Sequence, residues 1–193
     1  MVNYRLLIEY DGTRYYGWQR QPNQVTVQGK LEGVLSLMCG REVEVIGAGR
    51  TDAGVHARGM TANVNLETEL GAEEIREYLN RYLPDDIAVL EVKEASPRFH
   101  ARYNATGKTY CYTCFDGAVK PVFDRKYYTR LEEVPGTGFL QNMGRIMGGT
   151  RLEGGGGRMT VEEVRRVLES KERCKAGPTA PAQGLCLMRV DYD

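Results

Sequence analysis

Histidine and tryptophan are scarce in this sequence, and long apolar runs are missing from it. Its 193 residues include two histidines and one tryptophan. No apolar run approaches the roughly 20 residues of a membrane-spanning helix. The first residues lead directly into strand-like sequence, without the apolar stretch of a secretory signal peptide. We therefore expect a cytoplasmic protein that is not bound to a membrane.

Neither sign of charge predominates, because Lys plus Arg and Asp plus Glu each number 26. Residues 98–108 nevertheless carry three fixed positive charges and no carboxylate, and residues 11–30 are also basic on balance. Both segments contain aromatic side chains, a combination typical of a local phosphate-binding surface, although ordinary solvated loops explain it equally well. The cationic candidates are Arg14, Arg20, Arg98, Arg102 and Lys108.

Five cysteines are scattered along the chain, and only Cys111 and Cys114 are close enough to form a C-x-x-C pair. Such a pair raises the possibility of zinc binding or redox chemistry. The surrounding residues 108–115 alternate like a strand, in which positions i and i+3 face opposite sides. There is no second cysteine pair to complete a zinc site. We expect reduced, packed thiols and no metal.

Periodicity predicts a strand, a helix, two strands, a helix and a strand in the first half of the chain. Thr26 can cap the first helix, and Gly40 can end it. This βαββαβ order is the ferredoxin-like unit. The predicted elements lie at 2–10, 27–39, 42–48, 59–67, 72–83 and 87–92.

The second half begins with a predicted strand at 108–115. A helix is expected from about Gly138, and Thr160 with Glu163 forms a capping box for a last helix. Residues 186–192 alternate as a closing strand. We expect one α/β protein of the α+β type, with an N-terminal half at 1–100 and a C-terminal half at 101–193.

The segment Gly47–Ala57 carries an arginine, an aspartate and a histidine within seven residues. Its glycines allow the backbone to approach a ligand closely. Beside Arg50, the Asp52 carboxylate should stay ionised, which suits a nucleophile or an electrostatic stabiliser. An aspartate between glycines is also a common turn former, so the residues alone leave both interpretations open. The segment lacks the Gly-Lys-Ser/Thr of a phosphate-binding loop.

Residues 49–56, Gly-Arg-Thr-Asp-Ala-Gly-Val-His, resemble the signature of the TruA family of tRNA pseudouridine synthases. The similarity continues in order along most of the chain. The further similar blocks are residues 9–21, 83–89, 99–102, 108–112, 138–147 and 176–185.

The resemblance implies an isomerase that converts uridine to pseudouridine at tRNA positions 38, 39 and 40, in the anticodon arm, without a cofactor. It makes Asp52 the nucleophile and Tyr110 the ring that packs on the target base. Arg145 would hold the catalytic carboxylate, and Arg50 would have a structural or phosphate-binding role. From the residues alone, Tyr110 could belong to the core and Arg145 to a solvated helix face. The resemblance also implies tRNA as the partner and a homodimer.

The resemblance further implies a pseudouridine-synthase-like fold, in which two ferredoxin-like halves share a mainly antiparallel sheet. The family normally has a long segment between Tyr128 and Gly138, where this chain has only residues 129–137. We therefore expect an internal deletion and a truncated second half. The alternative function is a catalytically impaired or non-catalytic tRNA-binding homologue. Glycine replaces the family's usual valine at Gly144, Gly148 and Gly154.

Overall fold

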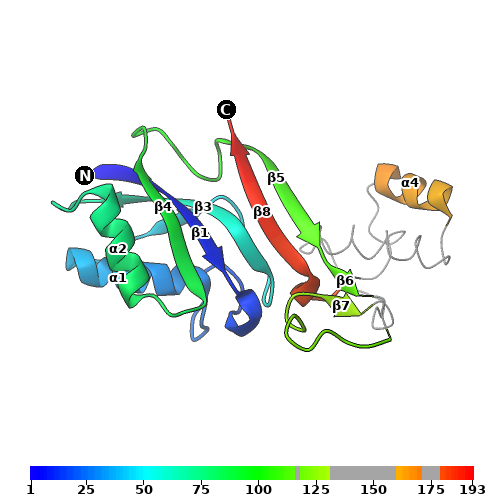
Figure 1. The fold of residues 1–193 in the computed structure, drawn as a ribbon. Coiled ribbons are helices and arrows are strands. Elements are labelled where there is room, and N and C mark those ends of the chain that lie inside the picture. Colours follow the sequence, from blue (N-terminus) through cyan, green and yellow to red (C-terminus); the bar gives the residue numbers. More distant parts are fainter. Residues whose placement is uncertain (116–117, 131–159, 171–178) are drawn as a thin grey trace. The chain divides into compact units, whose positions relative to one another are not determined.

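The computed structural model divides into two compact units. The first consists of Met1–Tyr110 together with Cys186–Asp193, and the second of Cys111–Leu185. The end of the chain therefore returns to complete the first unit. Figure 1 shows the elements of each unit. The structure describes residues 1–115, 118–130, 160–170 and 179–193.

The first unit begins with the predicted βαββαβ order. Two further strands, β5 and β8, enter the same sheet. A short 3-10 helix, Gly12–Arg14, follows β1. The elements are β1 (Val2–Tyr10), α1 (Val27–Cys39), β2 (Val45–Gly47), β3 (His56–Leu66), α2 (Ala72–Tyr82), β4 (Ile87–Glu94), β5 (Ala105–Tyr112) and β8 (Leu185–Tyr192).

The six strands form one mixed sheet with the order β4-β1-β3-β8-β5, and β2 pairs with β3 beside this path. β1 runs antiparallel to both β3 and β4. β8 runs parallel to β3, where His56 lies opposite Cys186 and Ala57 opposite Leu187. The architecture is therefore mixed α/β, with antiparallel pairs around the first three strands.

Local capping explains where α1 begins and ends. The Thr26 hydroxyl accepts a hydrogen bond from the amide of Gly29, as expected of an N-cap residue. Gly40 ends the helix at φ 64°, in the left-handed region that glycine enters without strain. Both positions confirm the prediction. In α2, the Glu74 carboxylate accepts from the amide of Gly71 at 2.8 Å.

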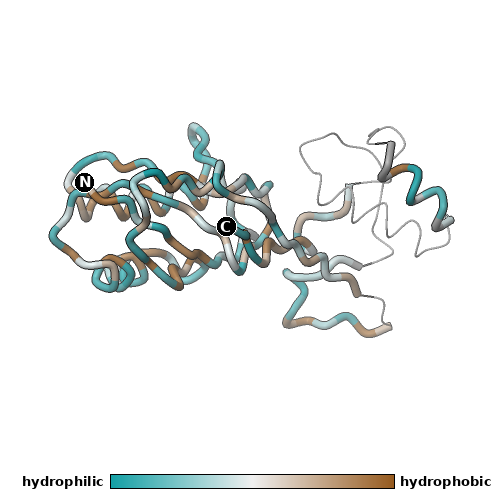
Figure 2. Tube along the Cα trace, turned by 90° about the horizontal axis from the view of Figure 1, so that it is seen from above, coloured by the Kyte–Doolittle hydropathy of each residue, from teal (hydrophilic) through white to brown (hydrophobic). Residues whose placement is uncertain are grey.

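The core of the first unit lies between the sheet and the two helices, which lie together on one side of it (Figure 1). Apolar and polar residues alternate through this unit, as a sheet with one buried face requires (Figure 2). The largest fully buried side chains are Trp18, Leu6, Ile8, Leu31, Leu35, Met60, Leu66, Ile75, Leu79, Leu187, Val27 and Val45.

In the second unit, β6 (Cys114–Phe115) pairs in parallel with β7 (Thr129–Arg130). The helix α4 (Val161–Ser170) begins with the predicted capping box, in which Thr160 and Glu163 exchange hydrogen bonds. A short 3-10 helix, Ala182–Gly184, precedes β8.

The strand predicted at 108–115 is confirmed over 108–112, within β5, but it is interrupted at Thr113 and does not run on as one strand. The amide of Thr113 donates to the Gly184 carbonyl at 2.8 Å, and its own carbonyl accepts from the Thr129 amide at 3.0 Å. The prediction that Cys111 and Cys114 face opposite sides of one strand therefore no longer applies. Both are exposed free thiols. Within the described ranges, no group of three or more His, Cys, Asp or Glu residues could hold a metal ion.

The helix predicted from Gly138, with Arg145 and the three glycines at valine positions, falls in residues 131–159, outside the part that the structure describes. None of the described helices is long and apolar enough to span a membrane.

Candidate active site

Asp52 lies on the connection between β2 and β3, and that connection is tightly turned. The amide of Ala48 donates to the Thr61 carbonyl at 2.8 Å, which fixes the start of the loop. The amide of Val55 donates to the Asp52 carbonyl at 3.1 Å, and Gly54 has a φ of 78°. Asp52 is half-buried. We call residues 48–55 the Asp52 loop.

The segment after β1 holds the Asp52 loop through its backbone. The amide of Trp18 donates to the Thr51 carbonyl at 3.0 Å, and the amide of Gly54 donates to the Tyr15 carbonyl at 3.3 Å. The Tyr10 hydroxyl and the Thr51 hydroxyl share a buried hydrogen bond of 2.8 Å. The backbone on both sides of Asp52 is therefore fixed by contacts that do not use its carboxylate.

Two glycines allow the segment after β1 to contact the Asp52 loop. A Cβ atom on Gly12 would lie 2.0 Å from the Val55 carbonyl oxygen. A Cβ atom on Gly17 would lie 2.5 Å from the Thr51 carbonyl oxygen, and its φ of 87° is strained for other residues. The segment after β1 thus needs glycine at both positions to approach the loop.

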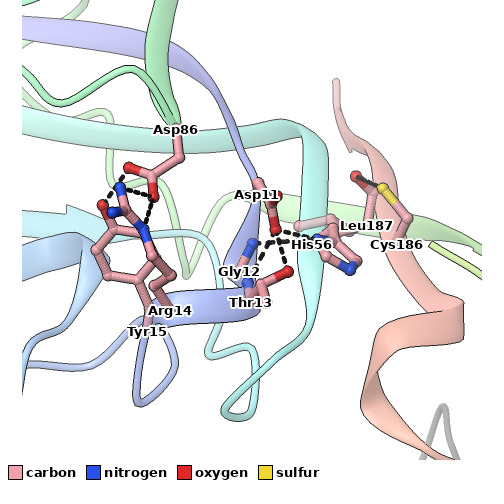
Figure 3. A network of polar contacts seen from close by, with 9 residues as sticks. All are labelled: Asp11, Gly12, Thr13, Arg14, Tyr15, His56, Asp86, Cys186 and Leu187. Atoms are coloured by element: carbon pink, nitrogen blue, oxygen red, sulfur yellow. Dashed lines mark hydrogen bonds and ion pairs between the residues drawn. The ribbon is translucent and has the colours of Figure 1, made fainter. Parts of the chain in front are cut away.

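His56, the first residue of β3, is buried where the Asp52 loop ends (Figure 3). Its Nδ1 accepts from the Gly12 amide at 3.1 Å, so a neutral ring carries its proton on Nε2. The same nitrogen lies 3.2 Å from Asp11 Oδ1, which accepts from the Thr13 amide at 2.9 Å. No role could be predicted for His56 or Asp11 from the residues alone, because the two meet only through the pairing of β1 with β3.

Tyr110 lies close enough to Asp52 to be affected by its charge. Its side chain belongs to β5 and is 42% exposed. Burial, and then the negative charge of Asp52, raises the pKa of the Tyr110 phenol. The ring is therefore a neutral, partly open surface beside the carboxylate.

The two arginines implied for the site cannot both be placed. Arg50 is exposed, and its Nε donates to Gln19 Oε1 at 3.1 Å. This contact ties the Asp52 loop to the segment after β1. Arg145 lies outside the described residues.

Two of the five cationic candidates are held by carboxylates. Arg14 contacts Asp86 through Nε at 2.8 Å and through a terminal nitrogen at 2.6 Å, and the Tyr15 hydroxyl donates to the same carboxylate at 2.5 Å (Figure 3). The Asp86 carboxylate raises the pKa of Arg14. Arg20 pairs with the buried Glu32 at 3.3 Å. Their charges are already compensated within the protein.

The other three cations are exposed, and no ion pair involves Arg98, Arg102 or Lys108 among the described side chains. The Lys108 ammonium lies 2.9 Å from the position that a Cβ atom on Gly49 would take, so it covers the start of the Asp52 loop. Burial, and then the positive charge of Arg102, lowers the pKa of Lys108. The Lys108 ammonium, which has no carboxylate partner among the described side chains, therefore lies next to the loop.

The mixed α/β sheet thus brings a carboxylate, a partly exposed aromatic ring and a cation into one region of the first unit. A sequence profile of the tRNA pseudouridine synthase family matches residues 6–104 and again residues 105–193. The chain therefore belongs to the tRNA pseudouridine synthase family.

Relatives match over the whole of both chains. A tRNA pseudouridine synthase A of Clostridium kluyveri is 40% identical over 244 positions, and one of Bacillus sp. strain KSM-64 is 41% identical over 245. A tRNA pseudouridine synthase A 2 of Bacillus cereus strain ATCC 14579 is 37% identical. This chain has only 193 residues, so dozens of positions in these relatives have no counterpart here. The chain is thus internally shortened; the placement of the gap between Tyr128 and Gly138 stays a prediction.

Proposed function

We propose that this chain isomerises uridine to pseudouridine in the anticodon arm of tRNA, at positions 38, 39 and 40, with Asp52 as the nucleophile. The observation that carries the proposal is the placement of Asp52. Its backbone is fixed on both sides by the segment after β1, and Tyr110 lies beside it on β5. A preorganised carboxylate next to an open aromatic face suits chemistry on a nucleoside.

The target uridine leaves its stack and enters the site, at a cost of a few kcal/mol. The bond between C1′ and N1 then breaks, uracil rotates, and a bond forms between C1′ and C5. The proton on C5 is lost to solvent and N1 gains one, so atoms and electrons balance without a cofactor. In these reaction steps Asp52 acts on the nucleoside, and the Tyr110 ring retains the detached base. Arg50 stabilises the loop, and the role that the resemblance implies for Arg145 falls outside the described residues.

RNA phosphates are contacted by Arg98, Arg102 and Lys108. Their exposure, and the lack of paired carboxylates among the described side chains, support this role, because each contact then releases a counterion without breaking an ion pair seen in the structure. Arg14 and Arg20, which are paired with carboxylates, stabilise the segment that holds the Asp52 loop. RNA shape provides most of the recognition.

The two matches to one family support two related halves, residues 1–100 with the Asp52 loop and an incomplete residues 101–193. We place the second half on the ferredoxin-like plan as well, in truncated form. The active species is a homodimer in the cytoplasm, with one tRNA lying across both subunits.

The test is tritium release from an unmodified tRNA transcript that carries [5-³H]uridine. We expect tritium to be released in the presence of the protein alone. We also expect the pseudouridine that forms to map to positions 38 to 40. Release with modification elsewhere would contradict the assigned positions. Tight tRNA binding without release would favour the non-catalytic homologue.

A further inference from the structure

A pair of stacked rings lies in the basic turn between β4 and β5. The His100 and Tyr103 rings are 4.1 Å apart between centroids and 28° from parallel. The Tyr103 side chain is 79% exposed, so its second face is open to solvent. Tyr110 is assigned to the target base, which leaves this second aromatic surface without a function.

Hydrogen bonds within the turn hold the ring pair in place. His100 Nδ1 accepts from the amides of Arg102 and Tyr103, at 3.2 and 3.3 Å. The amide of His100 donates to Asn104 Oδ1 at 2.7 Å, and the amide of Asn104 donates to the His100 carbonyl at 3.0 Å. The backbone of the turn and the His100 ring are therefore fixed, and Tyr103 stacks on that ring.

The sheet anchors the base of the turn. The Asn3 side chain donates to the Phe99 carbonyl at 2.9 Å. The amide of Ala101 donates to Asn63 Oδ1 at 2.8 Å, and its carbonyl accepts from the Tyr192 hydroxyl at 2.7 Å. Ala101 itself is fully buried. Because the base of the turn is already ordered, less conformational freedom is lost when a ligand stacks on its ring pair.

Cationic residues lie close in sequence to the exposed ring. Arg98 and Arg102 belong to the same turn, and Lys108 is close enough to Arg102 to feel its charge. A carboxylate lies near this stretch at Asp191, but it pairs with Arg189 at 2.6 Å. Aromatic rings flanked by free cations bind single-stranded RNA, since the ring takes a base and the cations take phosphates.

We propose that Tyr103, backed by His100, stacks on an unpaired base of the tRNA other than the target uridine, while Arg98 and Arg102 contact the phosphates on either side. This inference rests on the proposed function. It adds a second base-binding point, which fixes the register of the anticodon arm relative to Asp52. The contact forms in the bound substrate and persists through the reaction.

The test compares Tyr103→Ala, Tyr103→Phe and the control Tyr82→Ala in the full chain. Tyr82 is a matched control because it is 57% exposed and its ring lies 4.6 Å from that of Tyr78. Binding of an anticodon stem-loop RNA is measured by fluorescence anisotropy at several salt concentrations, and tritium release is measured on whole tRNA.

Loss of the ring should raise Kd and KM at least fivefold while kcat stays within twofold, because the contact stabilises bound substrate and transition state alike. Tyr103→Phe and Tyr82→Ala should match the parent. The slope of log affinity against log salt should not change in Tyr103→Ala, since no charge is removed. Parent-like binding by Tyr103→Ala, or an equal loss in Tyr103→Phe, would overturn the inference.

Photocrosslinking gives independent evidence. 5-iodouridine placed singly at unpaired positions of the stem-loop should crosslink to the peptide containing Tyr103 from at least one position. Crosslinks confined to other peptides would overturn the stacking role. If the parent chain itself releases no tritium, the proposed function fails. A parent that turns over, with no effect of Tyr103→Ala, refutes the second base-binding point alone.

Discussion

Backbone hydrogen bonds on both sides of Asp52 hold the loop, and these bonds do not depend on which side chain the residue carries. Asp52→Asn should abolish pseudouridine formation and leave tRNA affinity within about threefold, because the carboxylate acts in the chemistry and not on phosphates. Tritium release and filter binding measure the two effects. Asp85→Asn, at an exposed aspartate of the same unit, is the control. Turnover within tenfold of the parent would refute the nucleophile assignment.

Two substitutions of Tyr110 distinguish the contribution of its ring face from that of its hydroxyl group. Tyr110→Phe keeps the face beside Asp52 and should retain most substrate binding. Tyr110→Ala should weaken binding by about 1–3 kcal/mol, the value of one base stacked on an aromatic ring. Affinity and single-turnover rates measured on both variants check this. Small and equal effects of the two changes would assign Tyr110 to structure instead.

The placement of Asp52 on a glycine-rich connection could be predicted, because the loop residues and the flanking strand patterns are local in sequence. The position of His56 against Asp11 and Gly12 could not, because it arises from the pairing of two strands. The compensation of Arg14 by Asp86 was missed for the same reason. Charge counted along a segment does not show which cations are already paired.

At the scale of elements, the segment after β1 supports the Asp52 loop and contributes no predicted catalytic group. Gly12→Ala would place a Cβ atom 2.0 Å from the Val55 carbonyl oxygen, so the segment must move away from the loop. We expect a loss of about 2 kcal/mol or more in the free energy of unfolding, and a larger loss of turnover. Urea denaturation and tritium release provide the measurements.

Gly33→Ala is the matched control for that change. Gly33 lies within α1, and a Cβ atom there would meet nothing within 4 Å. Alanine in a helix interior is favoured by about 1 kcal/mol over glycine, so this variant should equal or exceed the parent in stability with unchanged turnover. If both glycine variants behave alike, the close approach of Gly12 does not determine the loop position.

The basic stretch at 98–108 should dominate the salt dependence of tRNA binding. Reversing Arg98 and Arg102 to Glu together should weaken binding and reduce the slope of log affinity against log salt by about one to two units. Arg41→Glu with Arg81→Glu makes the same change in net charge elsewhere on the first unit. An unaltered slope in the Arg98/Arg102 variant would exclude this stretch from the path of the RNA.

The ends of helices were predicted well where the residues that set them are close together in the sequence. The helix α1 begins after Thr26 and ends at Gly40, and α4 begins with the capping box of Thr160 and Glu163. These ends could be predicted because capping needs only neighbouring residues. The break at Thr113 was not predictable from alternation. Its backbone is drawn to Gly184 and Thr129, which are distant in sequence.

At the scale of the whole molecule, the two ends of the sequence form one folding unit. β8 lies between β3 and β5, so the last residues connect the strand that follows the Asp52 loop with the strand that carries Tyr110. The stability of the site should therefore depend on side chains near the C-terminus. Internal shortening, by contrast, spares every described residue that we assign to the site.

Leu187 and Met188 test this dependence, because they are adjacent on β8 and differ in burial. Leu187 is 1% exposed, whereas Met188 is 36% exposed. Leu187→Ala should lower the free energy of unfolding by about 2–5 kcal/mol, as large-to-small changes in a packed core do, and Met188→Ala should cost much less. Since domains are stable by only about 5–15 kcal/mol, the first loss should also speed amide exchange in β1 and β3. Hydrogen exchange followed by mass spectrometry measures it. Faster exchange confined to β8, with β3 still protected, would show that the closing strand opens by itself and that the site does not depend on it.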